Sequence, residues 1–434
     1  MPGFTEVADA RRPVVVDAVR TPFLNSTGAY AQLHNYQLAA LPLAEILRRA
    51  GLDAAAVELV TMGMVVQDVE TTNVAREAML VAGYPSHIPA YSISMAGVSP
   101  NVGVINLCDA IALGRLKIGV AAGTENFSDL PIRLPRRMRQ RAIRLSKARS
   151  LRQRLKLLGG IRPADLLPEL PSSQDLTTGL SMGSACENMT QRFAVTREAA
   201  DAYALSSHQR AQAAWDAGHY ADVMRVSLAQ IEVSRDDAIR GDTSLQRLAA
   251  LKPSFDPRGI VTPGNASGLT DGAAALLMMA QGEAEQRGLT PLARVCDAQL
   301  TGVHDMHSEM LLGPAMAIPP LLARHGLRMQ DIAVFELHEA FAAQILANQA
   351  ALADTRFARE ELGLEHAPGA IPAERLNLWG GSLALGNPFA GTGIRLISTA
   401  ARRLRLEGGR YAVVATCAGG GLGSALLLEN PEAV

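Results

Sequence analysis

The sequence contains few aromatic residues, few cysteines and no excess of one charge, and each shortage excludes a class of function. Aromatic residues make up 4% of the 434 positions, too few for the stacking surfaces that bind single-stranded nucleic acid. The formal net charge of −1 provides no positive field for non-specific binding to a nucleic-acid backbone. We therefore expect no nucleic-acid partner.

The four cysteines, Cys108, Cys186, Cys296 and Cys417, are far apart in the chain, and no Cys-x-x-Cys motif occurs. This spacing favours neither a zinc site nor a disulfide framework, so we expect no metal and a reducing compartment. No apolar run is long enough to span a membrane, and the first residues lack the apolar core of a secretion signal. These features predict a cytoplasmic protein.

The chain has ample material for a large core. Hydrophobic residues make up 48% and charged residues 19% of a length that suits two or three packed units. Short apolar strands are predicted at 14–16, 118–121 and 411–415, between alanine-rich helices. This alternation predicts an α/β fold whose strands are covered on both faces.

A faint internal repeat divides the chain into two halves. Residues 47–60 resemble residues 322–335, and residues 114–123 resemble residues 409–418 in the same order. The first pair reads as a helix that ends at a glycine, a short loop and an apolar strand. Two matches in one order predict duplicated halves.

The composition changes between the two halves, where it becomes basic and polar. We interpret residues 128–255 as an insertion carried by the first half. The expected division is then an N-terminal half of residues 1–127 and 256–280, the inserted loop domain 128–255, and a C-terminal half 281–434.

The insertion begins with a strongly basic stretch. Between Asp129 and Asp165 there are twelve Lys and Arg and no acidic residue, and residues 133–162 keep an apolar stripe at helical spacing. A solvated helix that covers a core edge explains this pattern. Peripheral contact with an anionic membrane, or docking of a partner enzyme, explains it equally well.

Three motifs in the last hundred residues belong together. They are His338–Phe341, Trp379–Gly393 and Cys417–Gly423. Their order resembles the C-terminal half of the thiolase superfamily, and the resemblance runs through nearly the whole chain. It is nearest to the β-subunit type of 3-ketoacyl-CoA thiolase from fatty-acid oxidation complexes, which shares the His-Glu-Ala-Phe motif and Ser128–Arg133. It implies a five-layered αβαβα thiolase fold and coenzyme A or an acyl-CoA as ligand.

Two positions depart from that family. Thiolases take up the acyl group on a cysteine, which the histidine of a Gly-His-Pro motif activates; the matching positions here are Gly97 and Asn387. Glycine forms no acyl-enzyme, although its backbone N–H can serve an oxyanion hole. We expect neither Ser99 nor Cys108 to replace the thiol, because one belongs to the turn and the other lies far along the next helix.

The resemblance implies roles for the remaining positions. His338 and Asn387 resemble the oxyanion pair of the related ketosynthases, and Cys417 matches the cysteine that moves a proton at the α-carbon. Ser267 matches the serine that contacts the pantetheine arm, and Met182 matches the loop that lines the same tunnel. The glycines that follow Cys417, with Gly419 among them, allow backbone amides to approach a ligand.

Three hypotheses follow. In the first, the protein is an enzyme that performs carbon–carbon chemistry on acyl-CoA thioesters through an enolate, independently of a nucleophilic cysteine. In the second, it is a non-catalytic acyl-CoA-binding or structural subunit. In the third, it is a conventional acetyl-CoA acyltransferase. Each is compatible with a homodimer or larger assembly, and with a hydratase–dehydrogenase partner subunit.

Overall fold

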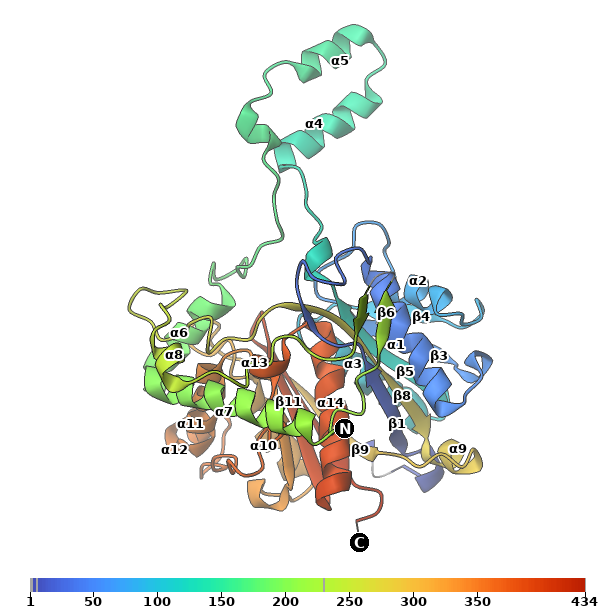
Figure 1. Cartoon of the computed structure of the whole chain (residues 1–434), viewed down its shortest axis with the longest axis vertical. Coiled ribbons are helices and arrows are strands. Elements are labelled where there is room, and N and C mark those ends of the chain that lie inside the picture. Colours follow the sequence, from blue (N-terminus) through green and yellow to red (C-terminus); the bar gives the residue numbers. More distant parts are fainter. Residues whose placement is uncertain (1–2, 5–6, 229–230, 434) are drawn as a thin grey trace.

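The computed structural model describes residues 3–4, 7–228 and 231–433, and its centre is one mixed β-sheet (Figure 1). The strand order is β10-β11-β12-β9-β1-β8-β5-β3-β4, and β2 also pairs with β8. The strands are β1 (Pro13–Arg20), β2 (Leu24–Asn25), β3 (Leu59–Gly63), β4 (Ala90–Ile93), β5 (Ile118–Glu125), β8 (Thr270–Ala280), β9 (Ala293–Gly302), β10 (Val334–Leu337), β11 (Tyr411–Ala418) and β12 (Leu422–Glu429). A small separate sheet contains β6 (Val226–Leu228) and β7 (Ile231–Val233).

The sheet repeats one pattern in its two halves. In the first half β3 and β5 are parallel, and β8 is antiparallel to both β5 and β1. In the second half β10 and β11 are parallel, and β12 is antiparallel to both β11 and β9. The halves join where β1 meets β9, through the pairs Val14–Arg294 and Val15–Ala293. The repeated connectivity accounts for the internal sequence repeat.

Helices cover both faces of each half. The central helices α3 (Ser99–Ala112) and α14 (Ala390–Glu407) share one core with strands of both halves. On the outer faces lie α1 (Asn35–Ala50) and α2 (Val74–Val81) for the first half, and α10 (Gly313–Arg324) and α11 (Ala342–Ala353) for the second. The layers are therefore helices, one half of the sheet, the central helices, the other half of the sheet and helices again, which confirms the predicted αβαβα architecture.

Shorter elements complete the chain. The remaining helices of the body are α6 (Met182–Arg192), α7 (Arg197–Asp216), α8 (Leu245–Ala249), α9 (Gln281–Gln286), α12 (Thr355–Glu361) and α13 (Ser382–Leu385). Single 3-10 turns occur at Asp9–Arg11, Ala54–Ala56, Phe127–Asp129, Pro163–Leu166 and Met329–Asp331.

Two glycines end matching helices as the repeat predicts. Gly51 follows α1 with φ 61°, and Gly326 lies two residues after α10 with φ 63°. Both lie in the left-handed region, which costs a residue with a Cβ atom more than it costs glycine. A 3-10 turn and then a parallel strand follow each glycine.

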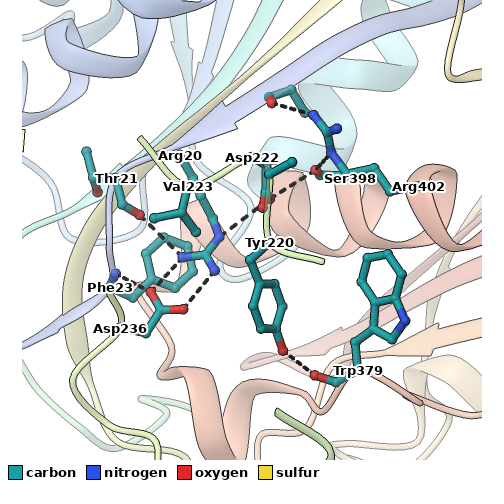
Figure 2. Close-up of polar contacts among 12 residues, drawn as sticks. Arg20, Thr21, Phe23, Tyr220, Asp222, Val223, Asp236, Trp379, Ser398 and Arg402 are labelled. Carbon is teal, nitrogen blue, oxygen red and sulfur yellow. Dashed lines mark hydrogen bonds and ion pairs between the residues drawn. The ribbon is translucent and has the colours of Figure 1, made fainter. Parts of the chain in front are cut away.

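A buried ion cluster attaches β1 to the later part of the segment 128–255 (Figure 2). The Arg20 guanidinium donates to both carboxylate oxygens of Asp236, at 2.7 and 2.8 Å. Its Nε lies 3.5 Å from Asp222, which also accepts from Ser398 of α14 at 3.0 Å. The bidentate pair fixes direction as well as distance. The Tyr220 hydroxyl donates to the carbonyl of Trp379 and extends the cluster toward the C-terminal half.

The basic stretch forms an arm that projects from the body (Figure 1). Its helices are α4 (Arg136–Lys147) and α5 (Leu151–Leu158), and neither contains a buried residue. After the arm, α6 and α7 pack against α11 in the C-terminal half. The segment 128–255 therefore has two parts of different character, and its status as one inserted domain stays a prediction. Within the described ranges, no helix is both long enough and apolar enough to cross a bilayer.

The closest contact in the central layer predicts a large loss of stability on substitution. A Cβ atom at Gly123 of β5 would lie 1.9 Å from the carbonyl oxygen of Ala390, where α14 begins. Since both partners are backbone, we expect Gly123→Ala to lower the free energy of unfolding by about 3 kcal/mol. Gly302→Ala is the control, because its Cβ would meet nothing closer than 3.9 Å. Denaturant unfolding measures both variants, and equal stabilities would contradict this packing.

Candidate active site

Two side chains of the site lie at the carboxyl ends of neighbouring parallel strands. His338 directly follows β10, and its backbone N–H donates to the carbonyl of Ala415 on β11 at 2.9 Å. Cys417 lies two residues further along β11. Ligands commonly bind in α/β folds at this end of the strands, where side chains leave the sheet.

The turn before α3 brings Gly97 against Cys417. A Cβ atom at Gly97 would lie 3.6 Å from the Cys417 carbonyl oxygen and 3.5 Å from the Cβ of Ala418. These are ordinary van der Waals contacts, so a Cβ atom fits at Gly97 without moving its neighbours. Ala96 has φ 46°, an unusual conformation for alanine that marks a sharp turn.

Neither candidate substitute for the thiol is available to a substrate. The Ser99 hydroxyl donates to the Ala96 carbonyl and accepts from the Met95 N–H at 2.7 Å, and its side chain is fully buried. Cys108 packs in the core between the two halves of the central sheet, where burial raises the pKa of its thiol. The expectation that neither residue replaces the nucleophile agrees with both positions.

Asn387 is held in one orientation. Its Oδ1 accepts from the Thr392 hydroxyl at 2.9 Å, and its Nδ2 donates to the Ser267 hydroxyl at 3.4 Å. Its backbone N–H donates to the Gly268 carbonyl at 3.0 Å. Since a side-chain amide carries two N–H donors, one N–H remains for a ligand.

His338 is a buried, neutral ring. Its Nδ1 lies 3.0 Å from the hydroxyl of Ser382, and 7% of the residue is exposed. Burial and, to a lesser extent, the nearby Arg395 cation lower the pKa of His338 to about 3. The imidazole is therefore uncharged at physiological pH and can serve a ligand oxygen as a neutral donor.

Cys417 is a protonated thiol. It is 3% exposed, and burial raises its pKa to about 12. The ordinary pKa of a cysteine therefore does not apply to Cys417 in the folded chain. At neutral pH the group begins as a proton donor, whereas a base at this position would first have to lose its proton.

The residues expected to bind coenzyme A lie around these groups and are partly exposed. The backbone N–H of Ser267 donates to the carbonyl of Ala340, two residues after His338, at 3.0 Å. A Cβ atom at Gly419 would lie 3.3 Å from the Met182 sulfur, which places α6 over the glycine turn. Direct contacts pair Gly97 with Cys417, Met182 with Gly419 and Ser267 with Asn387. His338 connects to these pairs through neighbouring residues, Ala340 and Ala415.

Several residues that support the site were not predicted from the sequence. The Glu339 carboxylate is fully buried and accepts four hydrogen bonds, from Tyr203, Ser207, Asn377 and the Leu383 N–H. Ser382 and Arg395 lie behind His338. One feature of the sequence could have indicated Glu339 and Ser382. Each is a charged or hydroxyl side chain that stands among glycines or apolar residues in a recognised motif. Among the described residues no group of three or more His, Cys, Asp or Glu side chains could hold a metal.

Family models match almost the whole chain. The model of the thiolase N-terminal domain matches residues 13–282, and that of the thiolase C-terminal domain matches residues 289–430. The trifunctional enzyme subunit beta of Bos taurus mitochondria is 43% identical over 421 residues, 96% of this chain and 88% of that protein. The 3-ketoacyl-CoA thiolase of Pectobacterium carotovorum is 40% identical over 422 residues, 96% of each chain.

Solved structures agree with this assignment. The acetyl-CoA acetyltransferase of Bacillus anthracis superposes with a TM-score of 0.81 and 30% identity, over 96% of this chain and 98% of that one. Human mitochondrial 3-ketoacyl-CoA thiolase in complex with CoA gives 0.81 and 29% identity, over 98% and 99%. The relatives are named as conventional thiolases, which favours that alternative over an enzyme with a degenerate site. The chain belongs to the thiolase family.

Proposed function

We propose that this thiolase-family protein acts on an acyl-CoA thioester beside the carbonyl, through an enolate and without an acyl-enzyme. The observation that supports the proposal is a glycine beside Cys417: Gly97, which the resemblance assigns to the nucleophile position, has no side chain to acylate. The neutral donors His338 and Asn387 remain. Such donors lower the energy of a negative oxygen when they are fixed before the reaction.

Cys417 holds its proton at neutral pH, because burial raises the pKa of its thiol. It therefore suits a reaction that breaks a carbon–carbon bond and needs a proton donor, more than one that forms such a bond and needs a base. With a malonyl-type thioester, the bond between the α-carbon and the carboxylate breaks, its electron pair forms the enolate, and carbon dioxide leaves. The Cys417 thiol then gives its proton to the α-carbon, and the thiolate regains a proton from water. His338 and the free Asn387 N–H hold the oxygen throughout. A 3-oxoacyl thioester gives the same enolate if water attacks the 3-carbonyl, so that the carbon–carbon bond breaks and a carboxylic acid leaves. A 3-hydroxyacyl thioester gives it by a retro-aldol cleavage, in which the hydroxyl loses its proton to water and an aldehyde leaves.

The proposed ligand fits the surrounding residues. Ser267, Met182 and Gly419 lie at the edge of the site, where a pantetheine arm would enter. A structural relative of 29% identity was solved in complex with CoA, which supports a CoA thioester as ligand here. No covalent cofactor is part of the proposal.

Conventional thiolysis is the second candidate, because the relatives are named as 3-ketoacyl-CoA thiolases. It requires an acyl-enzyme on another residue, and neither Ser99 nor Cys108 is accessible. A third outcome is a subunit that binds acyl-CoA without turnover. The name "subunit beta" of several relatives supports assembly with a hydratase–dehydrogenase partner, and homodimerisation is compatible with all three. Co-purification of a partner with the native protein tests that assembly.

The enolate proposal predicts turnover that depends on His338. We expect the wild type to act on at least one of malonyl-CoA, a 3-oxoacyl-CoA and a 3-hydroxyacyl-CoA. His338→Ala should lower kcat about 100-fold, because it removes a donor to the negative oxygen. His87→Ala, at an exposed position outside the site, is the control. No turnover of any of the three by the wild type, with CoA still bound, would replace the proposal by the binding-subunit hypothesis.

Restoring the missing nucleophile predicts a change of chemistry. Because a Cβ atom fits at Gly97, we expect Gly97→Cys combined with Asn387→His to fold and to become acylated by a 3-oxoacyl-CoA. Intact-protein mass spectrometry after a short incubation should then show the added acyl mass. The wild type should show none. An acyl adduct on the wild type would instead establish the conventional alternative.

We also propose that the arm touches an anionic membrane surface. Its two helices expose apolar side chains, including Ile143, Leu151 and Leu155, among the basic residues. Arg144, Lys147 and Lys156 lie together where the two helices face each other. Apolar side chains among cations suit the interface of a bilayer that carries acidic headgroups.

Vesicle binding tests the arm. Changing Arg144, Lys147 and Lys156 to Gln should weaken binding to phosphatidylglycerol vesicles about 100-fold, at about 1 kcal/mol for each lost cation. The control changes three exposed arginines of the body, Arg115, Arg258 and Arg359, to Gln. Co-sedimentation measures both variants. An equal loss of vesicle binding in the arm variant and the control variant would contradict a specific contact by the arm. Binding of the wild type to phosphatidylcholine vesicles with the same affinity would contradict it as well.

A further inference from the structure

A line of buried polar groups runs from His338 into the interior, away from the site. The Ser382 hydroxyl lies 3.0 Å from His338 Nδ1 and accepts from Arg395 Nη2 at 2.8 Å. Ser382 begins the short helix α13, and Arg395 lies on the central helix α14. Both residues are fully buried, so solvent does not exchange with these contacts.

The donors and acceptors determine where the imidazole proton lies. A guanidinium only donates, so the Ser382 oxygen accepts from Arg395 and keeps its own proton to give away. Within the described part of the chain, His338 Nδ1 is the one acceptor within hydrogen-bond distance of that hydroxyl. Ser382 therefore donates to Nδ1, and Nδ1 carries no proton. The proton of the neutral ring is then on Nε2, the nitrogen that has no hydrogen-bond partner among the described residues.

The charges around Arg395 act in the same direction. Burial and the Arg395 cation oppose protonation of the ring. The charged and titratable groups near Arg395 are Glu336, Arg20, Glu339 and Tyr220. Glu336 is paired with Arg403 at 2.8 Å, and Glu339 is bound by its four donors. None of these carboxylates forms an ion pair with Arg395 in the described residues, so its positive charge faces Ser382 and His338.

The buried arginine is otherwise hard to explain. Its Nε and Nη1 have no hydrogen-bond partner among the described residues, although the side chain is fully buried. A buried cation with unsatisfied donors destabilises a fold, so a stabilising role of Arg395 in its own right does not explain its position, whereas an effect on a neighbour does. The neighbour that it reaches through Ser382 is His338.

We propose that Ser382 and Arg395 are positioning residues that hold His338 as the neutral tautomer with its proton on Nε2. This fixes an N–H donor that faces the oxygen of a bound thioester or its enolate. The use of that donor rests on the proposed function, whereas the tautomer itself does not. Ser382 orients the ring and Arg395 orients Ser382, and neither touches the substrate.

Nitrogen-15 spectroscopy of the histidine-labelled full-length protein tests the proposal without turnover. His338→Asn identifies the His338 signals by their loss. We expect wild-type Nδ1 to be unprotonated and Nε2 to be protonated from pH 5 to 8. Ser382→Ala should give a mixture of tautomers, and Ser382→Thr, which keeps a hydroxyl, should restore the wild-type pattern. The control is Ser398→Ala, which removes a different buried hydroxyl, on α14. It should leave the His338 signals unchanged.

Kinetics provide the second measurement. Ser382→Ala should lower kcat about 10-fold or more with little change in KM, and Ser382→Thr should recover most of the loss. A wild-type ring protonated on Nδ1, or charged at pH 7, would overturn the positioning proposal, as would an unchanged tautomer in Ser382→Ala. If the spectra show the expected His338 tautomer but the protein turns over no substrate, the proposed function is contradicted and the positioning proposal is not. If the wild type turns over substrate but carries the His338 proton on Nδ1, the positioning proposal is contradicted and the proposed function is not.

Discussion

The buried carboxylate of Glu339 is the interaction on which the candidate site depends. Its two oxygens accept from Tyr203 and Ser207 of α7, from Asn377 and from the Leu383 N–H, at 2.7–3.3 Å. A single side chain thereby joins three segments that are distant in sequence. A carboxylate without water is stable only when donors surround it, so loss of any one donor disturbs the others. Since Glu339 follows His338, the same contacts hold the histidine.

The duplicated fold explains why the site lies where it does. The parallel pair β10–β11 presents His338 and Cys417 at its carboxyl end, and the central helices bring Gly97 and Asn387 to the same place from either side. Close backbone contacts make this arrangement rigid. At Gly381, a Cβ atom would lie 2.3 Å from the Glu339 carboxyl group, so the glycine there serves the carboxylate cluster.

The sequence predicted what is local and what is repeated. Glycine at the ends of α1 and α10, apolar strands and three ordered motifs were sufficient for the αβαβα fold and for the family. The supporting groups were not predictable in the same way. Ser382 and Arg395 meet His338 only after folding, and no local pattern says which hydroxyl lies behind which ring. Burial also changes chemistry without changing sequence, as the pKa of Cys417 shows.

The residues at the two positions that depart from the family, Gly97 and Asn387, are chemically consistent with each other. A cysteine nucleophile and its histidine act as one unit, since the histidine serves to make the thiolate. In the proposed enolate reaction, a basic histidine at position 387 would have no thiol at Gly97 to activate, whereas the Asn387 amide would donate to a negative oxygen. The names of the relatives argue for conventional thiolysis, and overall identity measures the shared scaffold. The reaction depends on a few side chains, so Gly97 and Asn387 are the positions at which the two chemistries can be distinguished by experiment.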